Sequence, residues 1–249
     1  MYKSIVEKVG NAAAAKVDLY QSKGRYFVSS ILAGVYVGVG ILLIFSISGL
    51  LGDSSATKIV MGASFGVALS LVVMAGSELF TGNNFVMTVG LLDKKASFKD
   101  TVNSWVLCYL GNLTGALIVA LVFVLAGLGG ESATGNALAG AAVAKASAPA
   151  VSLFFRGILC NMMVCLAVLC SIKLENEVAK LIMIWWCLFV FITSGYEHSI
   201  ANMTIYFAAL FTGGATVMQM VFNLVIVTLG NMVGGIALGA AYYYMGSNK

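Results

Sequence analysis

Residues 76–83 read Gly76-Ser77-Glu78-Leu79-Phe80-Thr81-Gly82-Asn83, and residues 195–202 read Gly195-Tyr196-Glu197-His198-Ser199-Ile200-Ala201-Asn202. The two stretches lie 119 residues apart and carry Gly, Glu and Asn at the same offsets. The same shift places the GNLTG of residues 111–115 on the GNMVG of residues 230–234, and Gly38 on Gly157. Polar groups inside long apolar runs are costly in a membrane and are tolerated mainly along a cavity or in pairs. The repeat therefore indicates a transport path.

The composition is that of a membrane protein. The 249-residue chain is 60% hydrophobic and 10% charged, and its mean hydropathy is +0.98. A soluble domain carries roughly a quarter charged residues. Apolar runs of about 20 residues, long enough to cross a bilayer, recur along the whole chain. We therefore predict an all-α, polytopic membrane protein. Residues 1–27 have scattered charges without an apolar core or a small-residue cleavage site, unlike a signal peptide.

Six spans are predicted, arranged as two repeats of three. We divide the chain into an amphipathic helix on the cytoplasmic surface (1–27), a first transmembrane repeat (28–127), an outer linker with a short helix (128–149), a second transmembrane repeat (150–245) and a cytoplasmic tail (246–249). Helices 2 and 5 are expected to break at the two polar stretches. Because three spans are an odd number, the second repeat enters from the opposite side, and the two breaks meet near the midplane.

The basic residues divide unevenly between the two sides of this arrangement. One side holds eleven of them, and the other holds three, namely Lys58, Lys145 and Arg156. Cytoplasmic loops carry the excess of Lys and Arg in membrane proteins. Both termini are therefore expected in the cytoplasm.

His198 is the only histidine and lies in the second break, where the first break has Leu79. Imidazole titrates near neutral pH, so it can donate a hydrogen bond or a proton to a weak-acid anion.

Each break carries one glutamate, Glu78 in the first and Glu197 in the second. We expect them to be structural, accepting hydrogen bonds from the backbone N–H groups that a broken helix frees; a charged pore wall is the alternative. The other residues assigned to helix-break structure are Gly82, Asn83, Gly195 and Asn202.

Further pore candidates fall into two groups, polar side chains and apolar side chains. Thr81 is expected to approach His198, Asn161 to face the lumen, and Lys145 either to attract anions or to be an ordinary solvated lysine. Side chains on the spans that lead into the breaks either pack or form hydrophobic constrictions; they are Phe65, Leu69, Phe80, Leu188 and Phe191. The five cysteines lie in apolar spans without metal-ligand spacing, and we expect no metal, no cofactor and no nucleic-acid partner.

Three motifs resemble the signatures of the formate/nitrite transporter family: VMAGSELFTG at 73–82, GILCNMMVCLA at 157–167 and GYEHSIANM at 195–203. The likeness covers essentially the whole chain and looks closest to the hydrosulfide-channel branch of anaerobic bacteria. It implies an aquaporin-like fold in a bacterial inner membrane, a homopentamer with one pore per protomer, and passage of formate, nitrite, hydrosulfide, acetate or lactate. By motif position, the central polar cluster would comprise Thr81, Lys145, Asn161, Glu197 and His198, and the constrictions Leu69, Leu79, Phe80 and Phe191, with Phe65 a further candidate.

Two functions stay open from the residues, a channel for small monovalent weak-acid anions and a proton-coupled secondary transporter of the same anions. A neutral-solute pore of the aquaporin type would normally carry two Asn-Pro-Ala breaks, and Pro149 is the only proline. A membrane enzyme would need a nucleophile with a base, or a metal cluster. One histidine and scattered cysteines supply neither.

Overall fold

The computed structural model describes residues 1–247, and within that range every regular element is a helix. The all-α prediction is therefore confirmed. Of the predicted tail, Gly246 ends the last helix, and residues 248–249 lie outside the described range. The helices are α1 (Tyr2–Gln21), α2 (Lys23–Leu51), α3 (Thr57–Ser64), α4 (Gly66–Met74), α5 (Phe80–Leu92), α6 (Phe98–Leu125), α7 (Ala133–Ala146), α8 (Ala150–Lys173), α9 (Glu177–Thr193), α10 (Ser199–Phe211) and α11 (Val217–Gly246).

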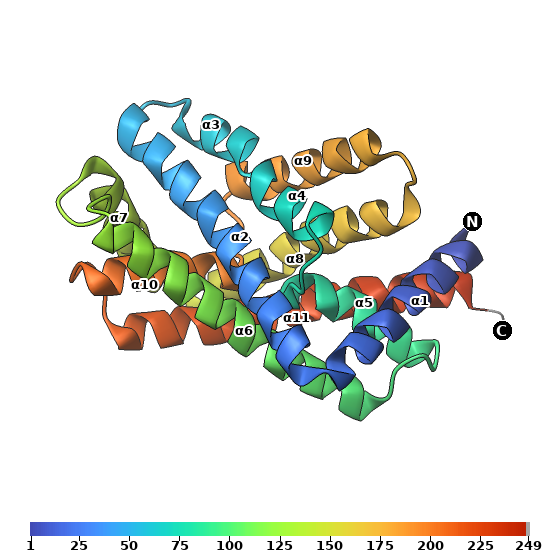
Figure 1. Cartoon of the computed structure of the whole chain (residues 1–249). Helices are drawn as coiled ribbons and strands as arrows, with labels where there is room; N and C mark the ends of the chain where they lie inside the picture. The colour runs from blue at the N-terminus through green and yellow to red at the C-terminus, as the bar shows by residue number, and fades with distance from the viewer. Residues whose placement is uncertain (248–249) are drawn as a thin grey trace.

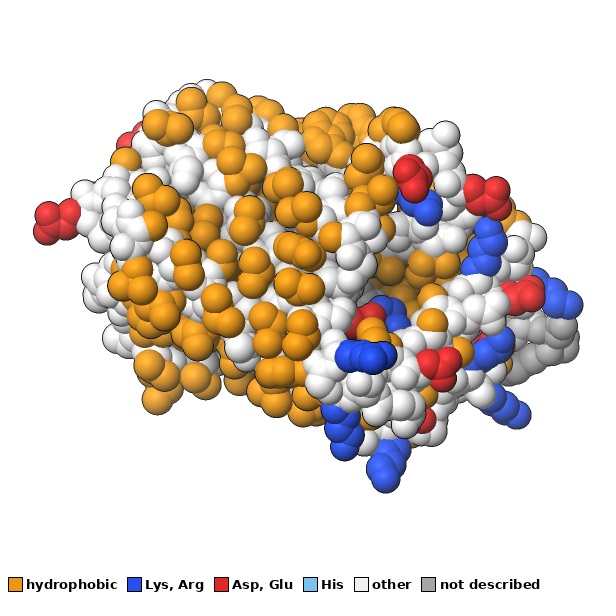
Figure 2. Space-filling view, viewed as in Figure 1, with side chains coloured by type: hydrophobic (Ala, Val, Ile, Leu, Met, Phe, Trp, Pro, Cys, Tyr) orange, Lys and Arg blue, Asp and Glu red, His pale blue; other side chains and the backbone are white. Residues whose placement is uncertain are grey.

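The spans form a bundle in which the two chain halves interlock (Figure 1). Five stretches are long and apolar enough to cross a membrane, namely α2, α3 with α4, α6, α8 and α11. The remaining predicted span comprises α9 and α10, which have 17 and 13 residues and lie on either side of the second break. Charged side chains gather at the end of the molecule where α1 begins and α11 ends, while hydrophobic side chains cover much of the rest of the face shown in Figure 2. This distribution is that of a polytopic membrane protein.

Both predicted breaks are present. Between α4 and α5 the chain leaves the helix over residues 75–79, and between α9 and α10 it does so over 194–198. Gly76 and Gly195 have φ of 74° and 73°, a left-handed conformation that glycine adopts without a steric penalty. The assignment of Gly82 to the helix break, with the unusual dihedral angles that this would imply, is wrong, because Gly82 lies within α5 and faces the Val168 side chain. The equivalent of Gly195 is Gly76.

Glycines bring the long helices into backbone contact. A Cβ at Gly115 would overlap the Ile31 carbonyl of α2, and a Cβ at Gly234 would overlap the Ile158 carbonyl of α8. The pairs α2 with α6 and α8 with α11 are therefore packed in the same way in the two halves. Such small-residue contacts are the usual means by which membrane helices approach closely.

The register of the first helix in each repeat differs from the sequence alignment. Gly230 packs on Gly157, whereas its equivalent Gly111 packs on Ser30. Ser30 is eight residues before Gly38, which instead faces Val119 and Thr204. The pairing of Gly38 with Gly157 is therefore wrong. Most of the offset lies in the helices themselves, because α2 continues to Leu51 beyond Ser30, whereas α8 ends at Lys173, fewer residues beyond Gly157. The connections that follow, 52–56 and 174–176, also differ in length, and loops tolerate such a difference without disturbing the packed helices.

We predict that Gly115→Ala lowers the unfolding free energy in detergent by about 1–3 kcal/mol, the usual cost of forcing a methyl group into a packed site. Gly140→Ala on α7 is the matched control, since a Cβ there meets nothing within 4 Å. The control is expected to be neutral or slightly stabilising. Melting temperatures followed by size-exclusion chromatography measure both, and equal values for the two variants would contradict the packing argument.

Candidate functional site

One buried amide anchors each helix break. Asn112, on α6, accepts a hydrogen bond at Oδ1 from the Phe80 N–H at 2.9 Å. Its Nδ2 donates to the Ser30 carbonyl at 2.7 Å and to the Glu78 carbonyl at 2.9 Å. Asn112 is completely buried. One side chain thus satisfies the start of α5, the end of the break and a carbonyl of α2.

The second break repeats this arrangement. Asn231, on α11, accepts from the Ser199 N–H at 2.9 Å and donates to the carbonyls of Gly157 and Glu197 at 2.8 and 2.9 Å. The carbonyls of Ser29 and Arg156 accept from the N–H groups of Glu78 and Glu197, respectively. Freed backbone donors are therefore taken by asparagines and by neighbouring carbonyls. The prediction that the two glutamates would accept them is wrong.

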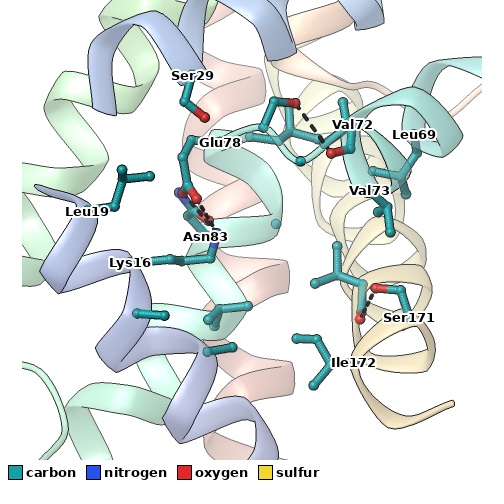
Figure 3. A pocket seen from close by; sticks show the side chains of 18 residues that line it. Lys16, Leu19, Ser29, Leu69, Val72, Val73, Glu78, Asn83, Ser171 and Ile172 are labelled. Carbon is teal, nitrogen blue, oxygen red and sulfur yellow. Dashed lines mark hydrogen bonds and ion pairs between the residues drawn. The ribbon is translucent and has the colours of Figure 1, made fainter. Parts of the chain in front are cut away.

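Each glutamate instead accepts from a lysine and an asparagine side chain. Lys16 Nζ lies 2.8 and 2.9 Å from the two carboxylate oxygens of Glu78, and Asn83 Nδ2 donates to Oε2 at 2.8 Å (Figure 3). Burial of a carboxylate requires such compensation, since the charge alone would be very costly away from water. We call Lys16, Glu78 and Asn83 the first triad.

The second triad has the same chemistry in the second half. Lys145 Nζ lies 2.8 and 2.9 Å from the Glu197 oxygens, and Asn202 Nδ2 donates to Oε2 at 2.7 Å. Lys16 is on α1 and Lys145 is on α7. These two helices, expected from the sequence to be a surface helix and a linker, therefore occupy equivalent places in the two halves.

The triads change the interpretation of the lysines. Lys145 is not an ordinary solvated lysine, because its side chain is only 19% exposed and faces a glutamate side chain that is 5% exposed. The charge of Lys145 is neutralised by Glu197, which weakens its expected role as an attractor of anions. Sequence reasoning missed Lys16 as a site residue. No signal marked it, because Lys16 and Lys145 do not coincide under the 119-residue shift.

His198 joins the two breaks. It is the N-cap of α10, and its Nδ1 accepts from the Ala201 N–H at 3.1 Å. Its Nε2 lies 3.0 Å from Oγ1 of Thr81, the second residue of α5, directly after the first break. A nitrogen that accepts an N–H carries no proton, so a neutral His198 bears its proton on Nε2 and donates to Thr81. The Thr81 hydroxyl hydrogen is then directed to another acceptor.

Three cavities follow one another past this histidine. The first is lined in part by Lys16 and has a volume of about 450 Å³; we call it the Lys16 pocket. The second is lined in part by Lys145 and has a volume of about 170 Å³; we call it the Lys145 pocket. Between them lies a central void of about 10 Å³, which holds about one water molecule. The void shares Leu69 and Leu79 with the Lys16 pocket, and Phe191 and His198 with the Lys145 pocket.

The predicted constriction residues divide between this path and the packing around it. Five of them line the central void, namely Phe65, Leu69, Leu79, Leu188 and Phe191. Phe80 is not among the lining residues of the three cavities and packs edge-on against Tyr109, with ring centroids 5.0 Å apart. Asn161 is also absent from their walls; it is completely buried and donates to the carbonyls of Asn231 and Thr81 at 2.6 and 3.2 Å. We therefore place Asn161 in the packing between helices.

We predict that Lys145→Met destabilises the protein by about 3–5 kcal/mol, since it leaves the buried Glu197 carboxylate without its cation. Adding Glu197→Gln is expected to restore most of the loss. Lys8→Met is the control, because Lys8 and Glu175 form an exposed pair whose N···O distance is 3.7 Å. That pair contributes about 0–1 kcal/mol. Denaturant unfolding in detergent measures all three, and a Lys145→Met variant as stable as the control would refute the assignment.

Comparisons with known proteins agree with this architecture. Residues 3–245 match the family model described as formate/nitrite transporter. The nitrite transporter NirC of Salmonella typhimurium is 44% identical over 226 residues, covering 88% of this chain and 82% of that protein. A probable formate transporter of Methanothermobacter thermautotrophicus is 39% identical over 253 residues, covering 94% and 92%.

Two solved structures share the fold. One is described as an FNT family ion channel; it has a TM-score of 0.92 and 41% identity, and the match covers 97% of this chain and 98% of that one. The other is a pentameric formate channel with formate bound, with a TM-score of 0.79, 26% identity and coverage of 90% and 97%. These relatives are transporters and channels and not enzymes. A six-span helical frame with two breaks, matched over nearly its whole length, assigns this chain to the formate/nitrite transporter family.

Proposed function

We propose that this protein is a channel for small monovalent weak-acid anions and that the path runs through the three cavities of each protomer. The observation that carries the proposal is the position of His198, the only histidine, between the Lys145 pocket and the apolar central void. The names of the relatives support formate and nitrite as substrates. Hydrosulfide as a substrate is supported by the motif resemblance alone, and its flux is to be measured beside those of formate and nitrite.

The apolar void acts as a filter against strongly hydrated ions. A volume of about 10 Å³ leaves no room for a hydrated anion, so the side chains around it must move and the ion must shed water. Multivalent anions hold their water most strongly and are excluded at this step. A monovalent anion of a weak acid is dehydrated at lower cost, and a donor at the end of the void offsets part of that cost.

The cap geometry favours hydrogen bonding by His198 over proton transfer from it. Protonation at Nδ1 would remove the bond from the Ala201 N–H. It would also place a positive charge at the N-terminus of α10, where the helix dipole is unfavourable to cations. We therefore propose that His198 stays neutral and that its Nε2–H, which Thr81 accepts in this structure, is the donor that turns to the passing anion. Thr81, which is absent from the cavity walls, orients the imidazole.

A proton-coupled secondary transporter is the second candidate, because imidazole is the side chain whose ordinary pKa lies near neutral pH, and His198 is the only one in the sequence. An imposed proton gradient across proteoliposomes separates the two mechanisms. Concentration of formate above its electrochemical equilibrium would reject a simple channel. Equilibration without concentration would reject coupling.

We also propose a homopentamer in a bacterial inner membrane, with both termini in the cytoplasm. The name of a structural relative supports the pentamer. The uneven distribution of Lys and Arg supports the orientation, since the charged end seen in Figure 2 carries both α1 and the end of α11.

We predict that His198→Phe lowers formate flux into proteoliposomes by about tenfold or more, since a hydrogen bond to a charged group contributes about 1.5–3 kcal/mol. Tyr206→Phe is a matched control, because Tyr206 is another buried residue of α10 and its hydroxyl bonds to the Ala142 carbonyl. The control is expected to retain flux. A His198→Phe protein with wild-type flux and unchanged pH dependence would refute the proposed role.

A further inference from the structure

The second span has an additional interruption at Phe65, between α3 and α4. Phe65 N–H donates to the carbonyls of Met61 and Gly62, and the Ala68 N–H donates back to the Phe65 carbonyl at 3.0 Å. The last bond spans three residues, the tighter 3₁₀ pattern that often marks a local constraint in a helix. The corresponding helix in the other half, α9, runs without interruption from Glu177 to Thr193. The interruption is therefore not part of the repeated scaffold.

Phe65 is an aperture residue. It is only 2% exposed, lines the central void and meets Phe191 edge-on, with ring centroids 5.5 Å apart and an interplanar angle of 83°. The local backbone at residue 65 decides where this ring lies relative to Phe191. Any group that fixes the interruption also fixes the width of the void.

Trp185, on α9, holds that backbone from the side away from the void. Its Nε1 donates to the Ala63 carbonyl at 2.7 Å, two residues before Phe65. Its ring sits against Gly66, where a Cβ would lie 2.9 Å from the indole Cδ1. The indole thus forms a hydrogen bond to Ala63 before the interruption and packs against Gly66 after it. Trp185 does not line any of the three cavities.

The internal repeat explains why this contact is singular. Under the 119-residue shift, Trp185 is the equivalent of Gly66. One half therefore supplies an indole and the other supplies the absence of a side chain, and the two meet where α4 packs on α9. A bend in a helix commonly arises where an outside group engages the backbone ladder.

We propose that Trp185 is a positioning residue that sets the aperture at Phe65, and hence the size limit for permeating anions, through its bond to Ala63 and its seat on Gly66. The proposal rests on the channel function proposed above. Without the indole N–H, α3 and α4 relax toward a continuous helix. Phe65 then turns away from Phe191, and the void widens. The permeating anion never touches Trp185, so its effect is on selectivity and not on attraction of the ion.

The test compares Trp185→Phe with Trp186→Phe by lactate and formate flux in proteoliposomes. Phenylalanine keeps an aromatic ring but removes the donor. Trp186 is the matched control because it is the next residue on α9, is 51% exposed and packs edge-on against Trp185. Trp185→Phe is expected to raise the ratio of lactate to formate flux by roughly fivefold, the order expected for loss of one hydrogen bond. Trp186→Phe is expected to leave the ratio at the wild-type value.

Two further variants keep the inference falsifiable. Gly66→Ala presses a methyl group on the indole without altering Trp185, and it is expected to raise the same ratio even if Trp185→Phe folds poorly. In a Phe65→Ala background, which already opens the aperture, Trp185→Phe is expected to add no further change. An unaltered ratio in Trp185→Phe or Gly66→Ala, or proportional loss of both fluxes, would overturn the inference. A wild-type protein that carries none of the anions would instead overturn the proposed function.

Discussion

The architecture depends on two buried side-chain amides, those of Asn112 and Asn231. A helix that breaks at membrane depth leaves N–H and C=O groups with no water to satisfy them. Each asparagine projects from a long, uninterrupted helix, and its side chain bonds to one backbone N–H and two backbone carbonyls. The breaks are thus tied to the rigid part of the fold. Their side chains can therefore point inward while the surrounding helices stay ordered.

The buried charges beside the path are paired. Glu78 and Glu197 are each closed by a lysine and an asparagine, so neither break presents an unpaired carboxylate to an approaching anion. What remains at the centre is a set of dipoles, the imidazole of His198 and the hydroxyl of Thr81. Conduction requires binding that is weak enough to release the ion. Neutral donors meet this requirement better than a bare lysine would.

The two halves share their scaffold but differ where chemistry is done. The triads and the asparagine anchors are duplicated, whereas Leu79 in one half corresponds to His198 in the other, and Gly66 corresponds to Trp185. Each difference lies at the central void or directly behind it. The repeat supplies the common frame, and a few positions that differ between the halves give the path its single histidine and its aperture.

The sequence by itself determined the membrane class, the two breaks and the residues at their centre. It could do so because apolar length, glycine and mid-span polar groups are local signals, and because the repeat marks the breaks at a constant shift. The triad partner Lys16, the equivalence of Ser30 with Gly157 and the brace at Trp185 were decided only in the tertiary structure. Helices and loops of unequal length reset the register between the halves, and a hydrogen bond between distant helices leaves no periodic trace in either one.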